Sequence, residues 1–163
     1  MSIKNIGLAV FLLFLTACGF TPMYGSEGQN AAAGLDKVEI ATIPDAEGVF
    51  LRNALIDRFY QDGYPVSPAY RLEISKIAEQ GRDLDITIES EATRKQVYLS
   101  TTLNLFDKTT GQSVLSRSLT ALTSYNVLGT QFTTRISESD AREAALNDLA
   151  RQIETQVALY LKK

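Results

Sequence analysis

Cys18 is the residue of this sequence with the clearest chemical role, and it is the only cysteine of the chain. It follows Leu15-Thr16-Ala17, an order that fits the lipobox, in which a signal peptidase cuts before a cysteine that carries a diacylglycerol on its sulfur. The amine freed by the cut then accepts a third acyl chain. Because one acyl chain binds a membrane only marginally and two or more bind firmly, we expect Cys18 to be a permanent lipid anchor. A single cysteine also excludes an intramolecular disulfide.

The residues before Cys18 are typical of an export signal. Lys4 carries a positive charge, and the apolar run from Ile6 to Leu15 is about half the length that a membrane-spanning helix needs. Residues 1–17 are therefore expected to be a lipoprotein signal peptide. Gly19 rather than aspartate follows the anchor, which in enteric bacteria favours the outer membrane over retention in the inner one.

Other chemistry finds little support. The chain has no histidine, which removes a common metal ligand and the base of a Ser-His-Asp triad, so only a Ser-Lys pairing is left for a hydrolase. Asp83 and Asp85 lie on the solvent side of an alternating segment, where charge is ordinarily solvated. No glycine-rich phosphate loop is present, and a net charge of −3 does not suggest nucleic acid. We expect no enzyme, no metal and no cofactor.

Two surface features could serve binding. The first is a nearly uncharged strand face, where a merely solvated sheet would carry more lysine and glutamate. Its members are Gln96, Tyr98, Ser100, Thr102 and Asn104 on one strand and Ser116, Ser118, Thr120, Leu122 and Ser124 on the next. The second is a set of basic residues, Arg94, Lys95 and Arg117, with Arg135 beyond them, that could meet anionic lipid headgroups.

The elements that position these residues begin with a short strand over 38–43, which Pro44 ends. Leu51, Leu55 and Phe59 recur every fourth residue, with Val49, Ile56 and Tyr60 alongside, and predict a helix that stops before Gly63. Alternating segments follow at 70–75 and 84–89. They are either two strands that turn at Gly81 or one long bent strand, and each is expected to bury one face.

A hairpin is predicted next, with strands 97–105 and 115–125. A type I turn with Gly111 in the left-handed position would place Lys108 opposite Gln112. In that register Leu105 faces Leu115, Leu103 faces Arg117, Thr101 faces Leu119 and Leu99 faces Ala121.

A second helix ends the chain. Ser137 or Ser139 can cap it, and its apolar face contains Leu146, Leu149, Ile153, Val157 and Tyr160. The order of elements predicts an α+β fold, a two-layer sandwich with two helices packed on one face of a four- or five-stranded mixed, mostly antiparallel sheet. We expect a lipidated flexible tether over 18–34 and one domain over 35–163.

Several short motifs resemble the LPS-assembly lipoproteins of the outer membrane (LptE-like), in their alphaproteobacterial form. The motifs are Cys18-Gly19-Phe20-Thr21-Pro22-Met23-Tyr24-Gly25, Leu51-Arg52-Asn53-Ala54-Leu55, Ser124-Tyr125-Asn126 and Asp140-Ala141-Arg142-Glu143-Ala144-Ala145. The resemblance covers nearly the whole mature chain. It implies a sandwich that plugs a large LPS-export β-barrel (LptD-like), assists its assembly, and helps lipopolysaccharide reach the cell surface without covalent chemistry.

The implied role agrees with the residue pattern. An uncharged polar face suits the hydrophilic inner wall of a barrel, so the resemblance suggests Tyr98, Ser100, Thr102, Ser118 and Thr120 as barrel contacts. It also implies a protein on the periplasmic side of the outer membrane that binds lipopolysaccharide.

Arg94, Lys95 and Arg117 are candidate lipopolysaccharide contacts, although no motif transfers such positions from the family. Two other classes stay open: a non-catalytic lipoprotein of another envelope system, for phospholipid transport or cell-wall regulation, and an envelope hydrolase.

Overall fold

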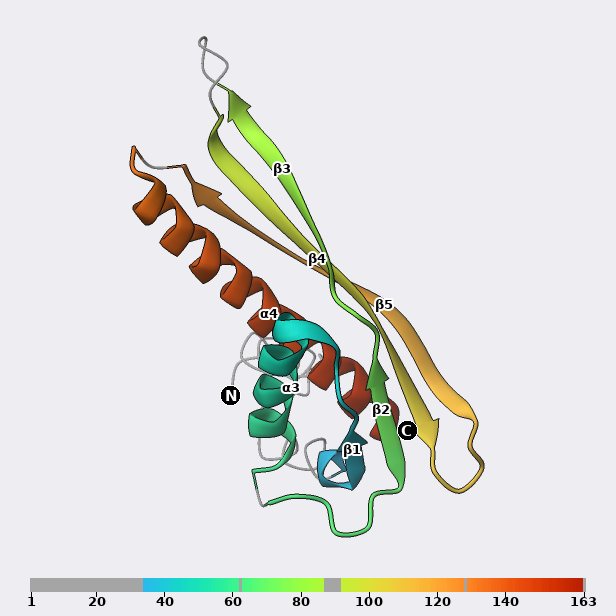
Figure 1. The fold of residues 1–163 in the computed structure, drawn as a ribbon. Coiled ribbons are helices and arrows are strands. Elements are labelled where there is room, and N and C mark those ends of the chain that lie inside the picture. Colours follow the sequence, from blue (N-terminus) through green and yellow to red (C-terminus); the bar gives the residue numbers. More distant parts are fainter. Residues whose placement is uncertain (1–33, 62, 87–91, 128, 163) are drawn as a thin grey trace, which may run out of the picture. The chain divides into compact units, whose positions relative to one another are not determined.

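The computed structural model describes residues 34–61, 63–86, 92–127 and 129–162. Cys18, the signal peptide and most of the expected tether therefore lie outside the described residues. The elements are η2 (Leu35–Lys37), β1 (Val38–Ile40), α3 (Asp45–Phe59), β2 (Tyr70–Ile74), β3 (Ala78–Ile86), β4 (Ala92–Asp107), β5 (Ser113–Asn126) and α4 (Gln131–Leu161). Figure 1 shows the two helices together on one face of the sheet. The predicted α+β architecture is confirmed, and the sheet has five strands.

Strand β4 is the centre of the sheet. β5 pairs with one of its edges over nearly the full length, while β2 and β3 share the other edge, and all three are antiparallel to β4. β1 joins β2 in parallel, with Val38 opposite Tyr70, so β1, α3 and β2 form a parallel crossover. The single parallel pair makes the sheet mixed.

β2 and β3 lie in line along β4, which settles the alternative that the sequence left open. The break falls at Ser75, whose backbone N–H donates to the Thr102 carbonyl (2.9 Å) and whose Oγ accepts the Thr102 N–H (2.9 Å). The hydroxyl of the buried Thr101 donates to the Ser75 carbonyl at 2.8 Å. Gly81 lies inside β3 and makes no turn. These bonds keep a nearly continuous edge paired although the strand bends.

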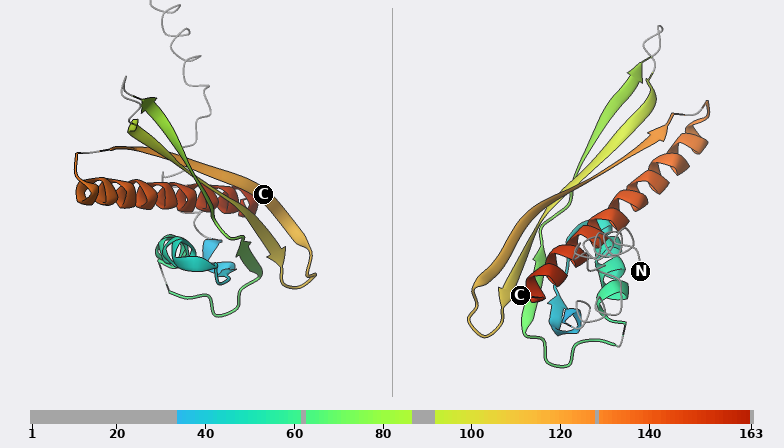
Figure 2. Two further views of the ribbon diagram at one scale, coloured as in Figure 1. Left: turned by 45° about the horizontal axis from the view of Figure 1, so that its top comes forward. Right: turned by 180° about the vertical axis from the view of Figure 1, so that it is seen from behind.

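One core joins the helices to the sheet. It contains Leu72, Leu99, Leu103 and Leu105 from the strands, and Leu51, Leu55, Leu149 and Ile153 from the helices. All eight are essentially inaccessible to solvent. Figure 2 shows from two further directions that α3 and α4 lie on the same side of the sheet. Neither of these two helices covers the opposite face of the β4–β5 hairpin.

The predicted hairpin register is confirmed at all four pairs, from Leu105 with Leu115 to Leu99 with Ala121. The predicted turn is wrong by one residue: the Asp107 N–H donates to the Gln112 carbonyl, so Asp107 and not Lys108 faces Gln112. The register shifts between Leu105 and Phe106, which leaves Val114 as an extra residue on β5. Gly111 does adopt the expected left-handed conformation, with φ of 70°.

Two residues expected on buried faces are exposed. The buried row of α3 starts at Gly48 and continues through Leu51, Leu55 and Phe59, which turns Val49 toward solvent. Leu84 is exposed because the register shifts between Asp83 and Asp85 and leaves it without a partner on β4.

The start of α4 also differs from the prediction. The helix begins at Gln131, and the Thr130 side chain accepts the Thr133 N–H, so neither Ser137 nor Ser139 is the cap. The residues from Gln131 to Asp140 bury no side chain, so no apolar periodicity marks this stretch in the sequence. The predicted apolar face is confirmed, with Leu146, Leu149, Ile153 and Val157 buried and Tyr160 partly buried.

Candidate functional site

The nearly uncharged face of the β4–β5 hairpin forms one surface, which we call the polar ladder. Its residues face each other in cross-strand pairs, which are Gln96–Ser124, Tyr98–Leu122, Ser100–Thr120, Thr102–Ser118 and Asn104–Ser116. Their polar groups bond to one another: Ser116 Oγ donates to Asn104 Oδ1 (2.7 Å), and the Thr102 and Ser118 hydroxyls lie 3.4 Å apart. Along β4, the Tyr98 hydroxyl donates to Gln96 Oε1 at 2.9 Å.

The polar ladder is accessible and carries no formal charge. Its β4 members are half-buried and its β5 members are exposed or half-buried, with Leu122 at 49 %. The five suggested contact residues, Tyr98, Ser100, Thr102, Ser118 and Thr120, lie together on it. Each hydroxyl keeps lone pairs free for a partner, and none of the ten side chains carries a charge that would have to lose its water when a partner covers them. The arrangement suits a large, polar, rigid contact.

The three basic candidates do not come together. Arg94 lies on the side of the polar ladder and its guanidinium donates to Ser124 Oγ (2.9 Å). Lys95, the next residue, points to the helix side, where its ammonium lies 3.4 Å from Asp83. Arg117 pairs with Leu103, about 30 Å further along the strands, and donates to the Ser116 carbonyl. A single headgroup could meet at most one of them.

A cluster that the sequence analysis missed ties α4 to β3. Arg142 donates two parallel hydrogen bonds to Glu79, at 2.7 and 2.8 Å, and a third to Glu138 at 2.9 Å. We call these three residues the Arg142 clamp. The bonds from Arg142 hold the pKa of the Glu79 carboxyl below its usual range, and the two carboxylates raise the pKa of the guanidinium. Glu138 and Arg142 are four residues apart, a spacing that predicts an ion pair on a helix. The sequence therefore contained a signal for this pair, but none for the bonds to Glu79.

Two hollows lie near the first turns of α4, and one of them is next to the clamp. One, of about 310 Å³, has Glu79, Asp83, Lys95, Tyr125 and Glu138 among its lining residues. Partial burial raises the pKa of the Tyr125 hydroxyl.

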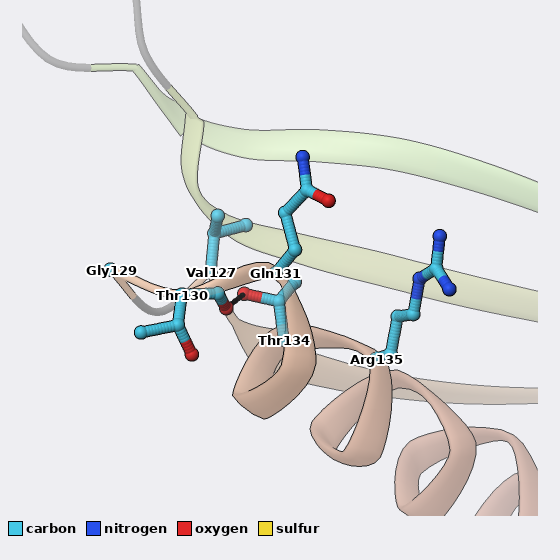
Figure 3. A pocket seen from close by; sticks show the side chains of 6 residues that line it. All are labelled: Val127, Gly129, Thr130, Gln131, Thr134 and Arg135. Atoms are coloured by element: carbon cyan, nitrogen blue, oxygen red, sulfur yellow. Dashed lines mark hydrogen bonds between the residues drawn. The ribbon is translucent and has the colours of Figure 1, made fainter.

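The other hollow, of about 380 Å³, is lined by Val127, Gly129, Thr130, Gln131, Thr134 and Arg135. Figure 3 shows the Gln131 and Arg135 side chains extending from α4 toward the strands, and the Thr134 hydroxyl bonded to the Thr130 carbonyl. No residue of α4 from Gln131 to Asp140 is buried, so this part of the helix does not fill the space beneath it.

The described residues contain neither a candidate metal cluster nor a candidate membrane-spanning helix. Among them, no three His, Cys, Asp or Glu side chains are grouped so that they could hold a metal ion. No helix in the described part of the chain combines the length and hydropathy needed to cross a bilayer.

The fold defines a class of small α+β sandwich proteins, and several solved structures that share it are described as bacterial lipoproteins. A protein of Caulobacter crescentus CB15 that is described as a lipoprotein aligns with a TM-score of 0.63 and 20 % identity over 82 % of this chain and 97 % of its own. A minor lipoprotein of Acinetobacter baumannii aligns with a TM-score of 0.61 and 25 % identity, over 76 % and 91 %. Rare lipoprotein B of Shewanella oneidensis shares the fold at 9 % identity, with a TM-score of 0.59 over 77 % and 98 %.

The family model described as LptE, lipopolysaccharide-assembly, matches residues 35–159, and the chain belongs to this family. The resemblance seen in the motifs is thereby confirmed. Comparison with curated protein sequences finds no match. The family consists of outer-membrane-associated lipoproteins whose role is assembly and not catalysis.

The structure explains two of the motifs physically. Leu51 and Leu55 of the second motif, Leu51-Arg52-Asn53-Ala54-Leu55, are core residues of α3. Ala141 and Ala145 of the last motif are buried where α4 begins to pack on the sheet, and Arg142 between them makes the clamp. Small residues on the inner side of the helix let it approach β5 closely enough for the Thr123 hydroxyl to bond the Ala141 carbonyl at 2.8 Å.

Proposed function

We propose that the protein is a lipid-anchored outer-membrane component that plugs an LPS-export β-barrel from the periplasmic side, assists its assembly, and promotes insertion of lipopolysaccharide at the cell surface. Acyl chains on Cys18 hold it at the membrane. Membership of the lipopolysaccharide-assembly family supports a role in lipopolysaccharide assembly. The polar ladder supports the proposal that the protein plugs the barrel. The protein acts by binding and not by catalysis.

The single observation that supports the plug proposal most directly is the absence of charge from the ten residues of the polar ladder. The inner wall of a large outer-membrane barrel is polar, and a charged plug face would need a matched countercharge at each contact. Serine, threonine and asparagine side chains can donate and accept, so they adapt to such a wall at little desolvation cost. The core on the other face leaves this face as the surface of the hairpin that is available for the barrel.

Lipopolysaccharide contact by Arg94, Lys95 and Arg117 belongs to the same proposal. Arg94 is the best placed of the three, since it adjoins the polar ladder and its side chain is exposed. Lys95 would have to leave Asp83 in order to bind a phosphate. Single Arg94→Ala, Lys95→Ala and Arg117→Ala variants are therefore expected to weaken lipopolysaccharide binding in the order 94, 117, 95.

The test of the plug is co-purification from detergent-solubilised outer membranes. The tagged protein should bring down a large β-barrel protein, identified by mass spectrometry. Thr120→Glu, which places a carboxylate on the polar ladder, should abolish the capture, because an unpaired charge at an interface costs several kcal/mol. Ser139→Glu, at an exposed position of α4, is the matched control and should retain it.

Two outcomes would reject the plug. One is capture that survives Thr120→Glu and Ser118→Glu together. The other is a barrel that stays abundant and folded after depletion of the protein. Depletion that disturbs phospholipid asymmetry or peptidoglycan while surface lipopolysaccharide stays normal would instead assign the protein to another envelope system.

A further inference from the structure

A short loop between α3 and β2 presents apolar side chains to solvent. Val66 is 101 % exposed and Tyr64 68 %, which makes them two of the most accessible large apolar residues among those described. We call residues 63–69 the Tyr64 loop. Pro65 and Pro68 lie on either side of Val66. The helix before the loop ends at Phe59, so the loop is not part of the core that α3 builds with the sheet.

The Tyr64 loop is held in place at both ends. The Tyr64 ring packs on Tyr60 with 5.1 Å between centroids. The Tyr60 hydroxyl in turn donates to the Val38 carbonyl and accepts the Ile40 N–H, which fixes it to β1. At the other end the Ala69 N–H donates to the Lys37 carbonyl (2.9 Å). The two prolines restrict the backbone further, so little conformational freedom remains to be lost when the exposed side chains bind.

The loop lies where the described chain begins. The bond between Ala69 and Lys37 places the loop next to η2 and Gly34. Figure 1 and Figure 2 show the loop, η2 and the end of α4 at the same end of the domain. At most about 55 Å of fully extended chain separates Cys18 from Gly34. An anchor at Cys18 would therefore be joined to the domain at this end, where the described chain begins.

Charged side chains at this end, the lysines and the exposed Asp36, suit the headgroup layer of a membrane better than a protein core. Lys37 and Lys162 are exposed and form no ion pair with any residue that the structure describes. Tyrosine prefers the headgroup level of a bilayer, where its ring is buried and its hydroxyl stays hydrated, and lysines are attracted to anionic headgroups there. Two exposed apolar side chains on a fixed loop, with two exposed lysines at the same end of the domain, fit the shallow interfacial layer of a membrane.

We propose that the Tyr64 loop is a second membrane contact, which inserts Tyr64 and Val66 among the lipid headgroups and so sets the orientation of the domain on the bilayer. The inference rests on the proposed acyl anchor at Cys18 and not on the plug. The anchor makes the second contact intramolecular, so even a weak interaction is populated. The lysines contribute attraction that weakens as salt is added.

The chain contains no tryptophan, so a single tryptophan is a clean reporter. The full acylated protein carrying Tyr64→Trp is reconstituted in phosphatidylethanolamine–phosphatidylglycerol vesicles, with and without lipids brominated on the acyl chains. Phe132→Trp, an exposed aromatic position on the first turn of α4, is the matched control. Vesicle flotation measures anchoring separately.

Quenching by brominated lipid should be about threefold stronger for the tryptophan at 64 than for that at 132, with a blue-shifted emission. Adding Val66→Asp to the Tyr64→Trp chain should remove most of this difference, and an unchanged melting temperature would show that the fold is kept. A protein that floats while both tryptophans are equally unquenched overturns the second contact but leaves the anchor standing. A blue shift without lipid quenching would show a protein contact and would also overturn it. A protein that does not float overturns both.

Discussion

The Arg142 clamp makes a prediction whose size follows from its geometry. Glu79→Gln keeps the shape of the side chain but removes the charge that receives two hydrogen bonds from Arg142, at 2.7 and 2.8 Å. Both partners are only partly buried, with side-chain exposures of 33 % and 27 %. A fully exposed ion pair contributes 0.2–1 kcal/mol, and a bidentate, partly buried one lies at or above the upper end of that range. We expect a loss of about 1 kcal/mol, or about 4 °C in melting temperature for a domain of this size.

The assay is urea unfolding followed by circular dichroism, on Glu79→Gln and on the control Glu73→Gln. Glu73 pairs with Arg71 at 3.2 Å, with both side chains about half exposed, so the control should change stability by less than about 0.5 kcal/mol. In a double-mutant cycle with Arg142→Gln, the interaction energy between the two residues should account for most of the stability lost in Glu79→Gln.

The pH dependence of the free energy of unfolding provides a second test of the clamp. The folded pKa of Glu79 lies below its ordinary value of 4.5, so its contribution is complete above that pH and is lost as pH falls through the folded pKa. Wild type and Glu79→Gln should therefore converge in stability under acid. A difference that persists undiminished at low pH, or a coupling near zero, would refute the account of the clamp as a charge interaction.

Three further predictions test the fold. Leu99→Ala, at a fully buried position, should cost about 2–5 kcal/mol, while Tyr98→Ala on the opposite face should cost much less, as urea midpoints would show. Gly48→Ala should destabilise α3 although alanine favours helices, because its Cβ would lie 2.8 Å from the Ile43 carbonyl; a gain in melting temperature would contradict this. Asp107 accepts two turn N–H groups that lower its pKa, so Asp107→Asn should lose its effect on stability as pH falls through that pKa, measured by thermal melts across acidic pH.

Much of the fold was predictable because its signals are local. Alternation with period two and the glycine of a short turn specify the hairpin, so the register from Leu99 to Leu105 follows from the sequence. The turn differs from the prediction by one residue, but the register of the hairpin is unchanged. Val114 is the extra residue on β5, and it forms a bulge next to the turn. The uncharged face followed from the same alternation, which is why all five suggested contact residues lie together.

Other features had no local signal. The start of α4 could not be found from periodicity because its first turns touch no core. The exposure of Leu84 follows from a bulge that pairing with β4 decides. Two basic neighbours, Arg94 and Lys95, form one motif in the sequence, yet they lie on opposite faces of the strand, and one of them is neutralised by Asp83 from β3.

By itself the sequence determined the type and order of most elements, the face of the hairpin without charge, and the place of Cys18 in its motif. These depend on residue spacing along one strand, one helix or one peptidase site. Tertiary structure alone decided that β2 and β3 share one edge of β4, that Arg142 reaches Glu79, and that the Tyr64 loop lies beside the start of the domain. Each of these joins residues far apart in the chain, and their proximity depends on how the whole core packs.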